Sequence, residues 1–111
     1  MITDKQAESA ADWIRDNAGK IASAKAERTY NEEYRKSLKA IIFNESEGTV
    51  AERENKAYAD KRYLEHLKTL KQSVFADEEL RAMKVAAEIK IEVWRSLQAN
   101  LRGKIDRKSV V

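Results

Sequence analysis

The chain of 111 residues has no cysteine, no proline and only three glycines. Without cysteine it can form no disulfide bond, thiolate zinc site or cysteine nucleophile. Proline and glycine are the residues that most often interrupt regular structure, so their scarcity leaves few places where a helix must end.

Long hydrophobic runs are also missing. No apolar run approaches the roughly 18–20 residues that span a bilayer, and the first residues, Met1 to Asp4, lack the positive flank and apolar centre of an export signal. We therefore predict no membrane insertion and a cytoplasmic location.

Residues that could carry chemistry are equally few. His66 is the only histidine, and a catalytic triad would need a base held next to a nucleophile. Glu65 is adjacent to His66 and so projects elsewhere, whereas bundle metal sites use a Glu-x-x-His spacing on one helix face. No glycine-rich loop could hold a phosphate. We predict a protein that is not an enzyme and needs no metal or cofactor.

The residues that are abundant favour helix. Charged residues make up 37% of the chain, and the commonest types, Ala, Glu, Lys, Arg, Leu and Gln, lose least on entering a helix. Thr3 with Gln6 forms a capping-box pattern that starts a first helix near residue 4. Gly48 can adopt the left-handed conformation that ends this helix near residue 46. Thr49 with Glu52 forms a second capping box.

The second helical region allows two interpretations. One is a continuous helix from residue 50 to about residue 103, where Gly103 is the next glycine. The other places a kink near residues 59–60, because Asp60 could cap a new helix from residue 61. In both cases two long helices joined by a short turn predict an all-α, antiparallel, coiled-coil-like hairpin within one domain, residues 1–111.

A stripe of mostly apolar residues runs along the second helix. Its steps of three and four average about 3.5 residues, the period of a coiled coil. The stripe comprises Tyr63, Leu67, Leu70, Val74, Asp77, Leu80, Lys84, Ala87, Ile91, Trp94, Gln98, Leu101 and Ile105.

The apolar arc widens around Trp94 to include Val85, Ala86, Ile89, Val93 and Leu97. A helix that is apolar over so much of its circumference needs more than one neighbour, and large aliphatic residues are sparse for a single-chain core. Both features predict a homo-oligomer, such as a dimeric four-helix bundle. The predicted interface is Leu67, Leu70, Val74, Leu80, Met83, Ala87, Ile91, Trp94 and Leu101.

The net charge of +3 is concentrated near the C-terminus, and residues 104–111 are predicted to be a flexible basic tail. Cations that neutralise phosphates would give salt-dependent nucleic-acid binding, with Tyr30, Tyr34 and Tyr63 available to stack on bases. Ordinary solvated helix faces are the alternative explanation of these charges. The candidate nucleic-acid-binding residues are Lys61, Arg62, Lys68, Lys71, Arg95, Arg102, Lys104, Arg107 and Lys108.

Residues 50–102 resemble small, uncharacterised, all-helical proteins of temperate tailed phages and prophages. The most specific part of the resemblance is Ile91-Glu92-Val93-Trp94-Arg95-Ser96. Such proteins are often encoded near recombination functions, which implies an accessory role in DNA recombination or replication in a bacterial host. A phage or host DNA-metabolism protein would be the partner. Direct DNA binding and a virion or scaffold role are the alternatives.

Overall fold

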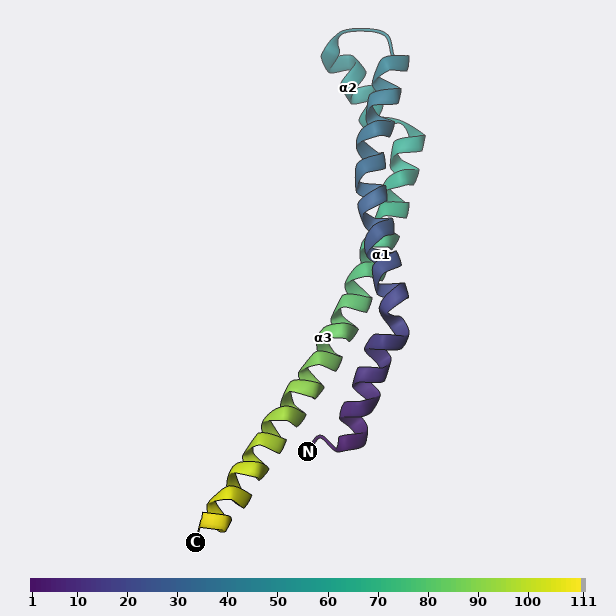
Figure 1. The fold of residues 1–111 in the computed structure, drawn as a ribbon. Coiled ribbons are helices and arrows are strands. Elements are labelled where there is room, and N and C mark those ends of the chain that lie inside the picture. Colours follow the sequence, from purple (N-terminus) through teal and green to yellow (C-terminus); the bar gives the residue numbers. More distant parts are fainter. Residues whose placement is uncertain (111) are drawn as a thin grey trace. The chain divides into compact units, whose positions relative to one another are not determined.

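The computed structural model describes the backbone of residues 1–110 and the side chains of residues 1–107. These residues form three helices and no strand: α1 (Asp4–Glu45), α2 (Val50–Ala59) and α3 (Lys61–Val110) (Figure 1). The predicted all-α hairpin of two long helices is confirmed. Asp60 interrupts the second helical region, so the interpretation with a new helix from residue 61 is the correct one.

Both predicted capping boxes start helices. The Thr3 amide donates to Gln6 Oε1 at 2.9 Å, and the Gln6 amide donates to Thr3 Oγ1 at 3.1 Å. Thr49 is the N-cap of α2, and its hydroxyl accepts a hydrogen bond from the Glu52 amide at 3.2 Å. Each cap satisfies amides that have no partner inside the helix.

Two short breaks separate the three helices. At the first, Gly48 has a φ of 118°, a backbone conformation that residues with a Cβ rarely adopt. At the second, Asp60 leaves the helical region with a ψ of 137°, and its carboxylate accepts from the Arg62 amide at 2.8 Å. The hydrogen bonds from the Arg62 side chain and amide lower the pKa of Asp60.

The predicted end of the last helix near residue 103 is wrong. Helix α3 continues through Gly103 and ends at Val110, so the predicted tail is helical up to that residue. A glycine inside a helix is unfavourable by only about 1 kcal/mol relative to alanine, and no proline follows it to exclude helix.

Contacts divide the chain into two compact units, which we describe separately. The central unit is Lys20–Glu79, and the terminal unit comprises Met1–Gly19 and Leu80–Val111. Each contains one segment of α1 and one segment of α3. The single domain predicted for residues 1–111 stays a prediction.

In the central unit, α2 packs against the end of α1 and the beginning of α3. Leu38, Ile42, Ala57 and Tyr63 form the core cluster, and Ala57 is fully buried. Around this core, side chains of α2 contact α1. The Lys39 ammonium lies 4.1 Å from the centroid of the Tyr58 ring. Because the buried side chain of Ala57 is only a methyl group, α2 can approach the other two helices closely.

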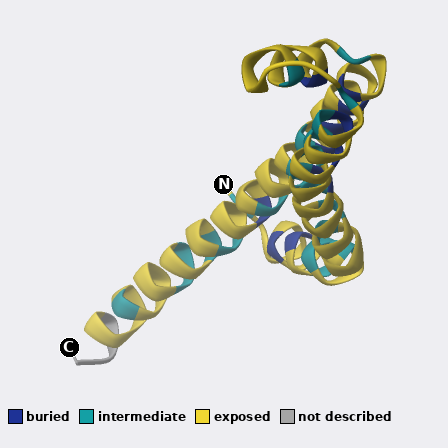
Figure 2. Cartoon of the chain, turned by 90° about the horizontal axis from the view of Figure 1, so that it is seen from above, coloured by how far each residue is buried: buried dark blue, intermediate teal, exposed yellow. Residues whose placement is uncertain are grey.

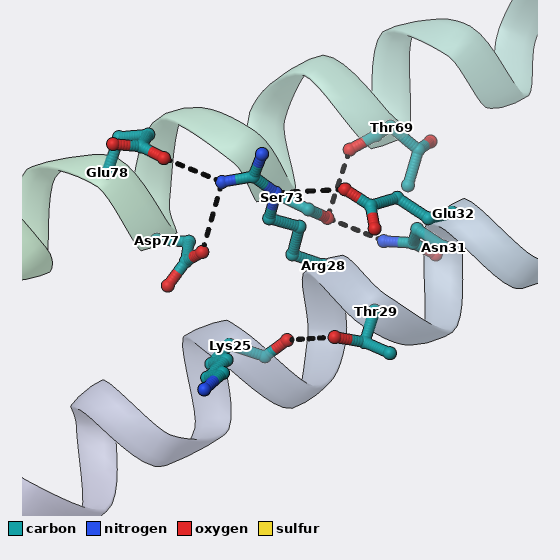
Figure 3. Close-up of polar contacts among 9 residues, drawn as sticks. All are labelled: Lys25, Arg28, Thr29, Asn31, Glu32, Thr69, Ser73, Asp77 and Glu78. Carbon is teal, nitrogen blue, oxygen red and sulfur yellow. Dashed lines mark hydrogen bonds and ion pairs between the residues drawn. The ribbon is translucent and has the colours of Figure 1, made fainter.

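Farther along the central unit, polar residues occupy the seam between α1 and α3. Asn31 Nδ2 donates to the Ser73 hydroxyl, and both residues are buried (Figure 3). One turn away, the Arg28 guanidinium bonds Glu32 on its own helix and Asp77 and Glu78 on α3, at 2.9, 3.2 and 2.7 Å (Figure 3). These hydrogen bonds raise the pKa of Arg28. The seam here is held by directional contacts.

In the terminal unit, α1 and α3 run antiparallel with a seam of small residues. Ala7, Ala10 and Ala87 are buried, and the Asp4 carboxylate accepts hydrogen bonds from Trp94 Nε1 at 2.7 Å and Gln98 Nε2 at 3.3 Å. Because Asp4 is the first residue of α1, residues 99–110 of α3 extend past its start. Figure 2 shows that this last part of α3 is almost entirely exposed where its side chains are described.

Candidate protein interaction surface

The residues predicted to form an oligomer interface differ widely in exposure. Leu70 and Ala87 are only 8% and 7% exposed, whereas Leu67, Met83 and Leu101 are exposed. The others, Val74, Leu80, Ile91 and Trp94, are half-buried. The predicted stripe follows the seam that closes the hairpin, since Asp77 and Trp94 bond residues of α1. Its most buried members have little surface left for a second copy.

A second apolar stripe lies on a different face of α3. Val85, Ile89 and Val93 are 48%, 57% and 42% exposed, and their spacing of four places them along one side of the helix. Ile91 follows Ile89 by two positions, which turns it about 200° around the helix axis, and it is half-buried. The outer stripe of Val85, Ile89 and Val93 thus faces away from the seam.

Beside this stripe, an open groove of about 480 Å³ lies between α1 and α3 of the terminal unit. Its apolar lining is contributed by both helices: Ala10, Trp13, Met83, Ala86 and Ala87. Its polar lining is Thr3, Lys5, Gln6, Ser9 and Lys90. The terminal unit therefore carries two neighbouring apolar surfaces.

The charged groups of this groove all have one sign. Lys5 on α1 and Lys90 on α3 line it, and no carboxylate does. Neither lysine forms an ion pair with any described side chain. Both ammonium groups are consequently available to an incoming anionic group.

The candidate nucleic-acid-binding residues fall into two sets, one in each unit. In the central unit, Arg62 bonds Glu45 at 2.8 Å and Asp60 at 3.1 Å, and these hydrogen bonds raise its pKa. Lys68 lies 3.7 Å from Glu65, while Lys61 and Lys71 are exposed. Acidic neighbours thus offset part of this positive charge.

In the terminal unit, the candidate basic residues lie along α3. Arg95 pairs with Glu92 at 2.7 Å. Arg102, Lys104 and Arg107 are exposed on the segment beyond the start of α1, and the Lys108 side chain lies outside the described residues. This second set has the larger excess of positive charge.

The three tyrosines proposed to stack on bases have different environments. Tyr30 and Tyr34 are 63% and 39% exposed, and their rings stack with centroids 6.0 Å apart. Tyr63 is 8% exposed within the core cluster, so its ring is not available to a base. Of these three tyrosines, Tyr30 and Tyr34 are the ones whose rings remain exposed.

The seam residues that sequence patterns missed are polar. His66 Nε2 lies 2.8 Å from the main-chain oxygen of Asn31, and His66 is buried with Asn31 and Ser73. This contact places His66 in the packed seam between α1 and α3. A regular spacing of apolar residues does not reveal seam positions that are polar. The usable signal was spacing, because His66, Leu70 and Ser73 step by four and three.

Comparisons do not assign the chain to a known group: no family model, curated protein or solved structure matches it. The resemblance to phage proteins stays a prediction. Among the described residues, no group of three or more histidine or acidic side chains is arranged to hold a metal ion. None of the described helices is long and apolar enough to cross a bilayer.

Proposed function

We propose that this protein is a non-enzymatic helical module that self-associates and acts through protein contacts. The observation that carries the proposal is the outer stripe of α3, where three large aliphatic side chains stay 42% to 57% exposed. Directly across the same helix, the seam with α1 buries mainly alanines. Apolar surface that the hairpin leaves open is suited to a second copy.

A symmetric dimer would bury the outer stripe of both copies. Each half-exposed aliphatic side chain has on the order of 1 kcal/mol left to gain from complete burial. A two-fold interface uses the same patch on both subunits, so each position contributes twice. Ala86, which lines the groove, lies three positions before Ile89 on α3, so the groove extends the apolar surface around this helix.

Light scattering of the purified protein at micromolar concentration tests this association. We expect the mass of a dimer for the natural sequence and of a monomer for Ile89→Glu, with helix content by circular dichroism unchanged. Ile41→Glu is the matched control, since Ile41 is 46% exposed in the central unit, and it should remain dimeric. A natural protein that is monomeric throughout this range would refute the proposal.

For the biological role, we propose an accessory factor in DNA recombination or replication in a bacterial cytoplasm. This part rests on the resemblance of residues 50–102 to phage proteins, and the partner would be a phage or host DNA-metabolism protein. Affinity purification from infected cells should recover such a protein. Recovery of the chain in purified virus particles would instead favour a virion or scaffold role.

Direct DNA binding is a second candidate, favoured by the exposed end of α3. Arg102, Lys104 and Arg107 are opposed there only by Asp106 among residues 99–107. Gel-shift titrations at about 50 and 200 mM salt should show an affinity that falls with salt. Lys104→Gln with Arg107→Gln should weaken binding, while Lys20→Gln, in the central unit, should not. An affinity for DNA that does not change with salt concentration would exclude this candidate function.

A further inference from the structure

We propose that the groove lined by Trp13, Met83, Lys5 and Lys90 binds an acidic amphipathic helix of a protein partner. This site lies beside the outer stripe and does not depend on self-association through it. The groove is built within the terminal unit alone, from the first turns of α1 and the facing turns of α3.

The length of the groove suits a helix. On α1 its lining extends from Thr3 to Trp13 and on α3 from Met83 to Lys90, distances of about 15 Å and 10 Å along the two helix axes. An amphipathic helix that enters a groove inserts side chains at positions i, i+3 or i+4, and i+7. Three such anchors extend over about 10 Å, which matches the facing walls.

The composition of the groove favours apolar anchors. Ala10, Ala86 and Ala87 leave space because their side chains are short, and Trp13 and Met83 contribute large apolar surfaces. Methionine is unbranched and flexible, so it can adjust to the shape of an inserted side chain. A partner with leucine or isoleucine anchors would fill this space.

The charged residues of the groove determine which side chains should flank the apolar anchors of the bound helix. Lys5 and Lys90 come from opposite walls and have no ion-pair partner among the described side chains. Carboxylates flanking the apolar face of a bound helix could therefore pair with either wall, whereas a basic helix would be repelled. A groove of the central unit differs here, because Glu54 lines it and already bonds Lys39 at 3.3 Å.

Nucleic acid is a poorer match for the same groove. Its phosphates could pair with Lys5 and Lys90, but they would leave the alanine floor and the Trp13 and Met83 walls without apolar contacts. An acidic amphipathic helix supplies both kinds of group at the required spacing. The combined apolar and cationic lining thus selects this class of ligand.

Calorimetric titration of the full chain with synthetic peptides tests the proposal. The probe is a helical peptide of about four turns with leucines at i, i+3 and i+7 and glutamates flanking them. Its controls are the same peptide with lysines replacing the glutamates and an acidic peptide of scrambled order. We expect micromolar binding of the probe, and at least roughly tenfold weaker binding of both controls.

Variants of the chain locate the binding site. Lys5→Glu with Lys90→Glu should weaken probe binding by at least roughly tenfold, since two attractive charges become repulsive. Lys20→Glu with Lys25→Glu makes the same charge change at two exposed sites of the central unit, and should leave affinity unchanged. Ala10→Trp should block the groove, and circular dichroism verifies that each variant folds.

Three results would overturn the proposal: equal affinity for the lysine peptide, equal affinity for the scrambled peptide, or no effect of Lys5→Glu with Lys90→Glu. A fourth result would assign a different ligand to the groove. If no peptide binds but this double variant converts a dimer into a monomer in light scattering, the groove receives a second copy instead. The lysine variants keep the test decisive even if Ala10→Trp does not fold.

Discussion

The two units use the same pair of helices but hold them together differently. In the central unit, buried Asn31 and Ser73 bond each other across the seam, and Arg28 joins carboxylates on both helices. In the terminal unit, the buried residues of the seam are alanines, and Asp4 accepts two hydrogen bonds across it.

Because of this difference, we expect the two units to have different roles, one in folding stability and the other in binding. Directional contacts in the central unit fix the register of α1 against α3, because a shifted register would leave Asn31 or Ser73 without a partner. The terminal unit buries alanines in its seam and exposes large aliphatic side chains on α3. We expect the central unit to provide most of the folding free energy and the terminal unit most of the binding surface.

The largest expected effect is on the core of the central unit. Ile42→Ala should lower the free energy of unfolding by about 2 to 4 kcal/mol, because it removes buried methyl groups and leaves a cavity. Ile41→Ala is the control, since Ile41 is 46% and Ile42 3% exposed. Urea denaturation measures both. Equal losses for the two would contradict a core centred on Ile42.

The next largest effect on stability is expected at the buried hydrogen bond between Asn31 and Ser73. Asn31→Ala should destabilise the fold by about 1 to 3 kcal/mol, since it leaves the buried Ser73 hydroxyl with one partner fewer. Asn55→Ala, at an exposed position of α2, should have a much smaller effect. A double-mutant cycle with Ser73→Ala isolates the pair, and a coupling energy near zero would break the contrast between the two seams.

Two glycines give effects of opposite sign. Gly48→Ala should be destabilising by about 1 to 2 kcal/mol, because φ is 118° and the added Cβ would crowd the Glu52 side chain. Gly19→Ala should be stabilising by roughly 0.5 to 1 kcal/mol, since its Cβ would meet nothing within 4 Å. Thermal unfolding compares the two, and a loss at both positions would refute this account of Gly19.

The smallest of these effects is expected at Asp60. Its pKa is lowered, so its contribution to stability is present above the ordinary aspartate value of about 3.9 and is lost as pH falls through the lowered pKa. Asp60→Asn should therefore lower the melting temperature at neutral pH, and the difference should shrink in acid. A difference that grew in acid would have the wrong sign.

Much of this fold follows from local patterns. Thr3 and Thr49 predicted two helix starts, and Gly48 predicted the turn. The stripe on the second helix predicted a coiled-coil-like packing face, but its residues were assigned to an oligomer interface and not to the seam with α1. Gly103 misled the prediction of the helix end, because a lone glycine is only a weak stop signal. Helix formation depends on several neighbours together, and those around Gly103 favour its continuation.

The candidate site was less accessible from sequence. The widened apolar arc around Trp94 indicated a second contact surface, but periodicity could not assign the seam to α1 and the outer stripe to solvent. The groove was not predicted, because it joins Lys5 and Lys90 from opposite ends of the chain. Tyr63 shows the same limit, since only packing distinguishes a buried ring from an exposed one.

The antiparallel pairing of α1 and α3 also has a kinetic consequence. Contacts near α2 close short loops, such as Lys39 with Glu54, whereas Asp4 and Trp94 are separated by 90 positions. Closing a longer loop is entropically less favourable, and local contacts generally form earlier. The contacts near α2 should therefore form first, and those between the start of α1 and the facing part of α3 should form last. The groove around Trp13 is then completed only at the end of folding.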